Sequence, residues 1–285
     1  MKRSLIAPII VMILVSLACS LNVNLPEMEV GDILVLNLDQ PLTNNSDVVS
    51  IDLSMGAGTL SLSGGAPGLI NGSIEYNVAD WEPAISQRSD SFSIKQVRAL
   101  SISGIPTDKI VNDWDLMLSS QVPLELNIEA GAYKGNLDLS GLRLRKLDIL
   151  EGASETTVNF DVPNPEVINN FKFQTGASFV KLYGLANANF KSMDFVSGAG
   201  SYVFSFDGTL QQDAEVNIKS AASNLEILIP SGMKVVIVNQ GKVINVNTKG
   251  TWTIKDNTYS TPGDGFTLTI TINMAVGNIV LSHAE

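Results

Sequence analysis

The stretch GAYKGNLDL, residues 131–139, decides the fold because its opening Gly–Ala phrase keeps returning along the chain. Close copies begin at residues 152, 176 and 198, with GASETTVNF, GASFVKLYG and GAGSYVFSF. Looser copies begin at residues 56, 221 and 275, with GAGTLSLSG, AASNLEILI and AVGNIVLSH. From 131 to 221 the copies start 21, 24, 22 and 23 residues apart. A fixed period of this size predicts a repeat architecture.

Three columns of the repeat are apolar in every copy when the first residue of each copy is numbered zero. They stand five residues before position zero, three before it and six after it, as Leu126, Ile128 and Leu137 do in the copy at 131. Alternation of period two predicts a β-strand with one face in the core. We therefore predict one strand before each Gly–Ala phrase and another after it.

The Gly–Ala phrase itself is interpreted as a corner between the two strands. The residue at position zero needs freedom in φ, and the next residue must be small because the chain bends there across the interior. The predicted corner residues are Gly56, Gly131, Gly152, Gly176, Gly198, Ala221 and Ala275.

Two strands and a corner in about 22 residues predict one coil of a parallel β-solenoid. Identical columns of successive coils then stack about 4.8 Å apart. The alternative is a β-sandwich, which also uses short alternating strands. A sandwich does not require all copies to keep the same columns apolar, so the repeat favours the solenoid.

The spacing of the copies also divides the chain. We expect a signal peptide at 1–18, an anchored stalk and first strand region at 19–44, a less regular N-terminal β region at 45–130, and the solenoid repeats at 131–285. The copies at 221 and 275 are 54 residues apart, which leaves room for two more coils and an insertion. The fold class predicted is all-β.

The N-terminus, MKRSLIAPIIVMILVSLACS, has the layout of a secretory signal peptide: basic residues, then an uncharged apolar run from Ser4 to Ala18. This run is shorter than the roughly 20 residues that a membrane-spanning helix needs. VSLAC, residues 15–19, resembles the lipobox of bacterial lipoproteins, although Ser16 stands where Leu is usual. The resemblance implies cleavage before Cys19, acylation of that cysteine and tethering to the extracytoplasmic face of a membrane. The alternative is an unlipidated anchor or an ordinary cleaved signal.

The composition of the chain excludes some classes of binding partner. The formal net charge is −11, which argues against nucleic acid, because phosphate binding needs a basic surface. It argues equally against docking on anionic lipid through basic patches. Cys19 is the single cysteine, so no disulfide framework exists.

No reactive constellation stands out, and we predict no enzyme, no cofactor and no metal. His283 is the only histidine and is interpreted as a capping residue near the last coil. Asp148 and Asp194 share a column two coils apart, roughly 9.6 Å, near the separation of the carboxylates of inverting glycosidases. Lys172 should stand between them, which indicates charge compensation on a solvated face. Weak calcium binding stays open at Asp138, Asp161 and Asp207, although calcium prefers six to eight oxygens.

Two aromatic residues fall in outward columns, Phe179 three residues and Tyr183 seven residues after position zero. Exposed aromatic side chains on one face can stack on sugars or mark an interface. The interpretation that we favour is that a neighbouring loop covers this face. Phe179 and Tyr183 are kept as candidate surface contacts.

Two stretches resemble the bacterial toast-rack family: GAGTLSLSGGAPGLINGSIEYNVADWEPAI at 56–85, and LDLSGLRLRKLDILEGAS at 137–154. Relatives in that family include the C-terminal domain of LiaF-like cell-wall-antibiotic-response proteins and adhesin-like domains. The resemblance implies a stacked β-solenoid in a cell-envelope setting, and it brings no catalytic residues to this chain.

These observations predict a non-enzymatic, lipid-anchored cell-envelope protein that acts as a rigid scaffold for adhesion or partner binding. The expected partners are the membrane, through the anchor, and either an envelope polysaccharide or a membrane protein. One alternative is an envelope-stress accessory that acts through a membrane partner. The other is a β-helix carbohydrate-active enzyme.

Overall fold

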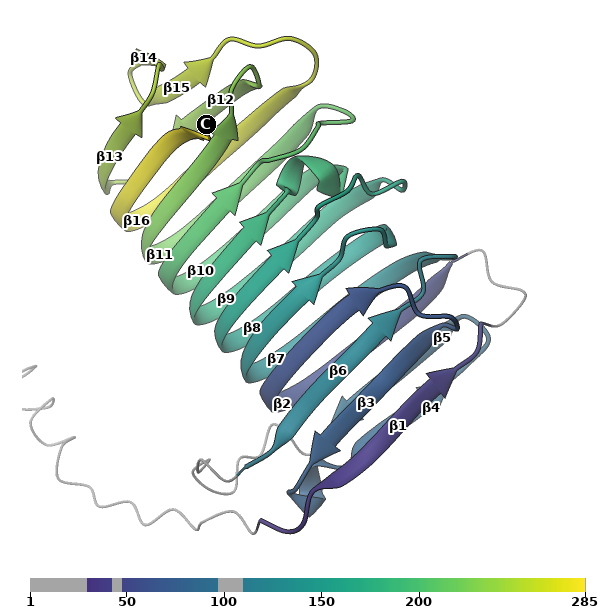
Figure 1. Ribbon diagram of the computed structural model, residues 1–285. Coiled ribbons are helices and arrows are strands. Elements are labelled where there is room, and N and C mark those ends of the chain that lie inside the picture. The colour runs from purple at the N-terminus through teal and green to yellow at the C-terminus, as the bar shows by residue number, and fades with distance from the viewer. Residues whose placement is uncertain (1–29, 43–47, 97–109, 285) are drawn as a thin grey trace, which may run out of the picture.

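The computed structural model describes residues 30–42, 48–96 and 110–284. The predicted signal peptide and the lipidation residue Cys19 lie outside these ranges. Sixteen strands of the described residues form one sheet, with two short 3-10 turns at Ala79–Trp81 and Leu185–Ala188 (Figure 1). Within the same ranges no helix is long and apolar enough to cross a membrane.

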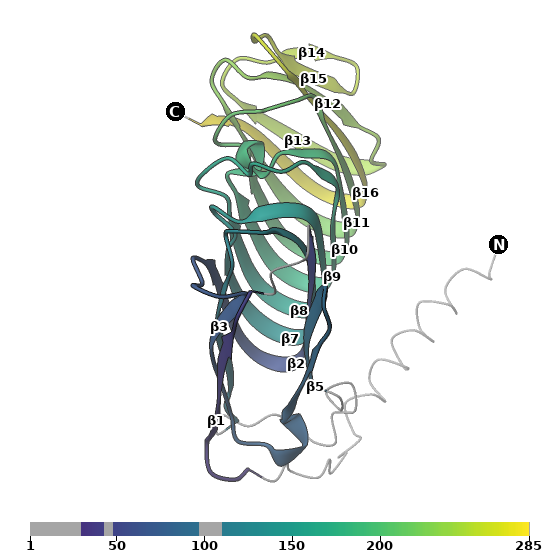
Figure 2. The ribbon, with the colours of Figure 1, turned by 90° about the vertical axis from the view of Figure 1, so that its right-hand side faces the viewer.

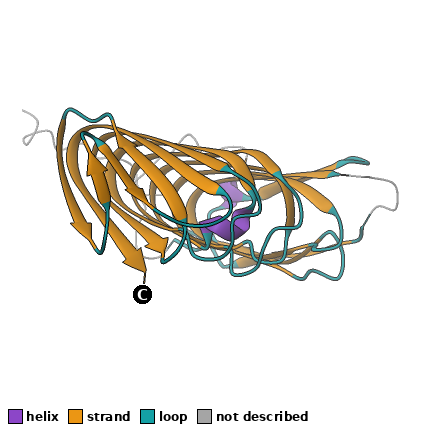
Figure 3. Ribbon diagram, turned by 90° about the horizontal axis from the view of Figure 1, so that it is seen from above, coloured by secondary structure: helices purple, strands orange, loops and turns teal. Residues whose placement is uncertain are grey.

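Seven long strands make the body of the fold. Each bends sharply near its middle, so that a first arm precedes the Gly–Ala phrase and a second arm follows it; one such strand is called a coil. Figure 3 shows the bends on one side of the stack and most connecting loops toward the other. The coils are β2 (Val49–Gly64), β7 (Pro123–Asp138), β8 (Arg143–Asn159), β9 (Ile168–Tyr183), β10 (Phe190–Ser205), β11 (Ala214–Pro230) and β16 (Thr267–Ala284).

All neighbouring coils pair in parallel, in the order β2-β7-β8-β9-β10-β11-β16. The register joins equal positions of the repeat: Leu126 pairs with Leu147, and Leu147 with Phe171. The predicted parallel solenoid and its column alignment are therefore confirmed. One detail differs, because each predicted pair of strands is a single strand that runs unbroken through its bend.

A split coil continues the stack at each end. β5 (Ser91–Gln96) and β6 (Asn112–Leu118) pair in parallel with the first and second arms of β2. β12 (Lys234–Asn239) and β13 (Val243–Lys249) do the same on β16. The expectation of two further coils between 221 and 275 was wrong. β11 pairs directly with β16, although the two strands are far apart in the sequence. After β11 the chain first forms β12 and β13, one layer further along the stack, and then returns as β16 to the layer between them and β11. The intervening residues therefore supply only one split coil.

Antiparallel strands cap both ends of the stack (Figure 2). At the N-terminal end, β3 (Ile70–Tyr76) pairs with β6, β1 (Leu34–Gln40) with β3, and β4 (Pro83–Gln87) with β5. At the C-terminal end, β15 (Thr258–Thr261) pairs with β12, and β14 (Thr253–Lys255) with β15. These short strands change the direction of pairing where the regular repeat stops.

The core lies between the two arms of each coil. Inward side chains of successive coils stack on one another, and Phe173, Phe195 and Phe204 are fully buried. The Phe195 ring centroid lies 5.4 Å from that of Phe173 and 4.8 Å from that of Phe204. Apolar burial of this kind is the dominant stabilising term in folding, and it holds the coils in a fixed register.

The bend needs glycine for a different reason from the one predicted. The glycines at position zero do not have positive φ, and the small residues that follow them point outward instead of crossing the interior. A Cβ added to Gly176 would lie 2.6 Å from the carbonyl oxygen of Gly152, and one on Gly198 would lie 2.7 Å from that of Gly176. Close approach of stacked backbones therefore selects glycine at these bends.

Candidate binding surfaces

A polar ladder runs along the outer face of the first arms. Asn127 donates from Nδ2 to Asp52 Oδ1 at 2.7 Å, and Lys146 Nζ donates to Asn127 Oδ1 at 3.0 Å. Lys146 Nζ also lies 3.0 Å from Asp148 Oδ2. Further along, Asn217 Nδ2 donates to Asp194 Oδ1 at 3.2 Å. These contacts between coils hold the polar side chains of the face in a regular array.

Asp148 and Asp194 occupy one column of this face, and Lys172 pairs in register between them. This is the order predicted from the repeat. Around Asp148 and Lys172 the face is hollowed into a depression of about 290 Å³. The depression is also lined by Asp52, Asn127, Glu129, Leu150 and Gln174. Leu150 is 50% exposed, so the depression combines hydrogen-bonding groups with one apolar contact.

The two predicted aromatic contacts lie on the outer face of the second arm of β9. Phe179 is 65% exposed, and its register neighbours Glu155 and Ser201 are polar. Tyr183 is half-buried beside Asn159. Phe179 therefore presents its ring to solvent, whereas Tyr183 is partly covered.

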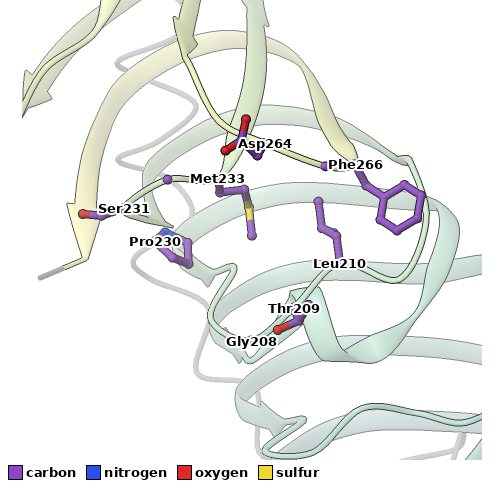
Figure 4. A pocket seen from close by; sticks show the side chains of 10 residues that line it. Gly208, Thr209, Leu210, Pro230, Ser231, Met233, Asp264 and Phe266 are labelled. Atoms are coloured by element: carbon purple, nitrogen blue, oxygen red, sulfur yellow. The ribbon is translucent and has the colours of Figure 1, made fainter.

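A pocket of about 290 Å³ opens on the loop side of the stack, near its C-terminal end (Figure 4). It is lined by the loops at 208–210, 231–233 and 264–266, with Leu210, Met233 and Phe266 as apolar groups and Asp264 as the acidic one. The turn motifs PSG and PGDG indicate two of these loops. Their adjacency could not be predicted, because the loops meet only through the fold of 231–266 onto the end of the stack.

A buried carboxylate lies inside the bend of β8. Glu151 is 3% exposed and accepts hydrogen bonds from the Tyr133 hydroxyl at 3.0 Å, from Thr156 Oγ1 at 2.8 Å and from Ser154 Oγ. Burial raises the pKa of Tyr133 well above its usual range, and the charge of Glu151 adds to this effect. Because solvent does not reach Glu151, the cluster stabilises the bend and is no binding site. Its only signal in the sequence is an acidic residue in an inward column.

His283 lies near the end of β16, and its ring stacks on Trp252 with centroids 5.0 Å apart. Its Nε2 lies 3.0 Å from the carbonyl oxygen of Thr251. Across residues 30–42, 48–96 and 110–284, no group of three or more His, Cys, Asp or Glu side chains is arranged to hold a metal ion. The predicted calcium candidates Asp138, Asp161 and Asp207 thus form no such group.

Residues 27–164 match the family model of the N-terminal domain of toast_rack proteins. The chain carries a toast-rack domain. The match includes the capping strand β1, the coils β2, β7 and β8, and most of the depression around Asp148. The toast-rack match therefore runs across the boundary at residue 130 that the spacing of the repeats suggests.

Three solved structures resemble the toast-rack chain. A candidate cell adhesion protein from Clostridium sporogenes is 18% identical, with a TM-score of 0.48 over 89% of this chain and 99% of its own. A candidate adhesin from Bacteroides fragilis is 8% identical, with a TM-score of 0.36 over 88% and 97%. One from Parabacteroides merdae is 10% identical, with a TM-score of 0.33 over 89% and 96%. A search of curated protein sequences finds no significant match.

Proposed function

We propose that this toast-rack protein is a non-enzymatic scaffold of the cell envelope, tethered by a lipid on Cys19, that binds a neutral polysaccharide through the outer face of its first arms. The observation that carries the proposal is the depression around Asp148 and Lys172. It offers carboxylate, amine and amide groups beside the exposed side chain of Leu150. Sugars present the same combination of hydroxyl groups and apolar C–H faces.

The rigidity of the coil stack supports this proposal. The polar side chains of the ladder are attached to strands whose other face is buried in the core, and hydrogen bonds between coils restrain them further. A preorganised surface loses little conformational entropy when it binds. Equivalent columns repeat about every 4.8 Å, so an extended polymer can contact several coils at once.

The charge of the chain narrows the ligand class. With a net charge of −11, the protein repels acidic polymers, and carboxylates at Asp52, Glu129 and Asp148 line the depression itself. Carboxylate oxygens accept hydrogen bonds from hydroxyl groups. A neutral, hydroxyl-rich polysaccharide therefore fits better than a teichoic or uronic acid polymer.

Catalysis is the less favoured function of the same face. A glycosidase needs two carboxylates that act together across one bond. Here Lys172 pairs in register between Asp148 and Asp194, and amide groups of Asn170 and Asn217 bond Asp194 at 3.2 Å each. These contacts occupy both carboxylate oxygens of Asp194, and Lys172 separates Asp194 from Asp148, which supports binding without cleavage.

The test uses the full chain and isolated neutral envelope polysaccharide, and measures co-sedimentation and release of new sugar ends. We expect co-sedimentation without release. Lys172→Ala and Leu150→Ala should each weaken binding about five- to tenfold, because each removes one contact worth about 1 kcal/mol. Lys181→Ala is the matched control, since Lys181 is an exposed lysine of the same strand that lies on its second arm, away from the proposed binding face.

Equal binding by all three variants would show that the ligand binds outside the depression. Release of sugar ends would overturn the non-enzymatic assignment. A complete lack of binding would overturn the polysaccharide as ligand and point to a protein partner.

A further inference from the structure

The second arms end in a strand with a free edge at each end of the stack. At the N-terminal end β1 pairs with β3, and at the C-terminal end β13 pairs with β16; among the strands of the described residues neither has a second partner. Both strands are seven residues long. A free strand edge presents unpaired backbone groups and is a template for pairing with another chain.

The two edge strands run in the same direction. β13 is parallel to β16, as the coils are to one another. β1 is antiparallel to β3, which is antiparallel to β6, which is parallel to β2. Two reversals restore the original direction, so β1 runs parallel to the second arm of every coil. If β13 of one copy met β1 of another end to end, they would pair as neighbouring coils do.

The register of the repeat extends to both edges. Leu36 pairs through Ile74 and Trp114 with Leu60, four residues after position zero. Val246 pairs with Ile279, also four residues after position zero. Both side chains pack against the core of their own end of the stack. If two copies stacked in this register, the inward side chain of Val246 in one copy would therefore lie against that of Leu36 in the next.

Opposite charges meet in the same register. Asp39 pairs through Asn71 and Met117 with Ser63, and Lys249 pairs with Ser282; both lie seven residues after position zero and are exposed. The C-terminal end also carries Lys242 before β13 and Lys255, next to Asp256, on β14. The N-terminal end carries Asp32 before β1. In a chain of net charge −11, this gathering of lysines at one end complements the acidic residues at the other.

Exposed apolar side chains are found at the same two ends. Ile33, Leu34 and Val35 are 54%, 50% and 53% exposed at the start of β1. Val243 is 68% exposed at the start of β13, and Ile254 is 55% exposed on β14. Exposed apolar side chains along a free strand edge are normally covered in a stable soluble protein.

The two ends are also stepped in opposite senses. Beyond β2, the second arm has three strands (β6, β3, β1) and the first arm two (β5, β4). Beyond β16, the second arm has one strand (β13) and the first arm three (β12, β15, β14). The projecting second arm of the N-terminal end is therefore opposite the recessed second arm of the C-terminal end when two copies stack end to end. Between β16 of one copy and β2 of the next, the second arms then hold four strands (β13 with β1, β3 and β6) and the first arms five (β12, β15 and β14 with β4 and β5). The contact therefore requires β14, which is three residues long and exposed, to move aside.

We propose that the protein assembles head to tail with further copies of itself, β13 of one copy pairing in parallel with β1 of the next so that Lys249 faces Asp39. A head-to-tail contact of this kind does not close on itself and builds open-ended chains of copies. The proposal goes beyond polysaccharide binding and does not depend on it, because the contact uses the ends of the stack and leaves the outer faces free.

Disulfide trapping tests the register. One full-length chain carries Asn37→Cys and a second carries Asn247→Cys; both residues are exposed and lie five residues after position zero. Paired strands lie about 4.8 Å apart, within the range that a disulfide spans. Mixing and mild oxidation should give a dimer on a non-reducing gel. Asn245→Cys is the matched control, because it is exposed on the same face of β13 but about 6.6 Å away along the strand.

We expect at least fivefold more dimer with Asn247→Cys than with Asn245→Cys, and a background set by the chain with Cys19 alone. Asp39→Lys in the first chain should lower the yield several-fold, and Lys249→Asp in the second should restore it. The restoration also shows that the variants fold, since Asp39 accepts a hydrogen bond from Asn71 that the substitution removes. Equal yields at 245 and 247, no product above background, or charge reversal without rescue would each overturn the proposal.

Discussion

Gly152 stacks so closely on Gly131 that a Cβ at position 152 would lie 2.5 Å from the carbonyl oxygen of Gly131. Real Cβ atoms do not approach an oxygen at this distance, so any side chain larger than hydrogen must push the two coils apart. The same relationship links Gly176 to Gly152 and Gly198 to Gly176. The bend is thus a column of backbones in contact.

Gly152→Ala should lower the free energy of unfolding by about 1–3 kcal/mol, the usual cost of overpacking a well-packed site. Urea unfolding followed by circular dichroism measures the change. Ala153→Ser is the control, because Ala153 is exposed on the outside of the same bend and should tolerate the hydroxyl. Equal stability of the two variants would mean that the bend has room for a side chain.

Glu151→Ala should destabilise the protein by about 2–4 kcal/mol. The substitution removes a buried carboxylate and leaves the hydroxyls of Tyr133, Ser154 and Thr156 without their acceptor. Glu155→Ala is the matched control on the same strand, since its ion pair with Lys134 at 3.5 Å is solvent-exposed and should change stability by less than about 1 kcal/mol. Similar effects for the two would contradict the role given to Glu151.

The contacts of Glu166 with two arginines lead us to expect that the protein loses stability in acid. Hydrogen bonds from Arg145 at 2.9 Å and Arg143 at 2.5 Å lower the pKa of Glu166 below its ordinary value of 4.5. A lowered folded-state pKa contributes stability that is present above the unfolded pKa and is lost as the pH falls through the folded one. Glu166→Gln should therefore melt at a lower temperature than the wild type at pH 7.

The same two proteins should melt at more similar temperatures near pH 3, because the stability that the lowered pKa of Glu166 contributes is lost progressively as the pH falls below 4.5. Thermal melting at both pH values measures the difference. A gap between wild type and Glu166→Gln that stays constant from pH 7 to pH 3 would show that the carboxylate charge does not stabilise the loop that carries it.

Cys19→Ala should release the protein from the membrane or leave it unprocessed. The lipid that we propose needs the thiol, and no other cysteine can replace it. Cell fractionation followed by immunoblotting detects the change, and Ser20→Ala serves as the neighbouring control. If Cys19→Ala stays membrane-bound and is processed like the wild type, the protein is held by other means.

The register of the coils could be predicted because stacking forces equal columns to coincide: Leu126, Leu147 and Phe171 are apolar for the same reason that they are neighbours. The place of Lys172 between Asp148 and Asp194 follows from the same columns. The order of the coils could not be predicted where an insertion interrupts the repeat, because every coil carries the same pattern. The sequence therefore does not say that β11 meets β16 directly while β12 and β13 lie beyond it.

The candidate surfaces were predictable to different degrees. Outward placement of Phe179 follows from its column, but its high exposure depends on the small or polar side chains of its neighbours. Leu150 and Gln174 enter the depression through the stacking of three coils, and nothing in their local sequence marks them. The need for glycine at the bend is visible in the sequence, whereas its cause is not, since left-handed φ and close backbone approach select the same residue.

The stack of bent strands also fixes the distance between the two ends of the protein. Each long strand makes its extensive contacts with the strands paired to it, so the coils behave as equal units added along one axis. Adding or deleting one whole repeat would move the C-terminal cap by about 4.8 Å relative to the N-terminal one and would leave every remaining interface unchanged in kind. The number of copies of the Gly–Ala phrase thus sets the length of the stack, and with it the distance between the N-terminal and C-terminal caps.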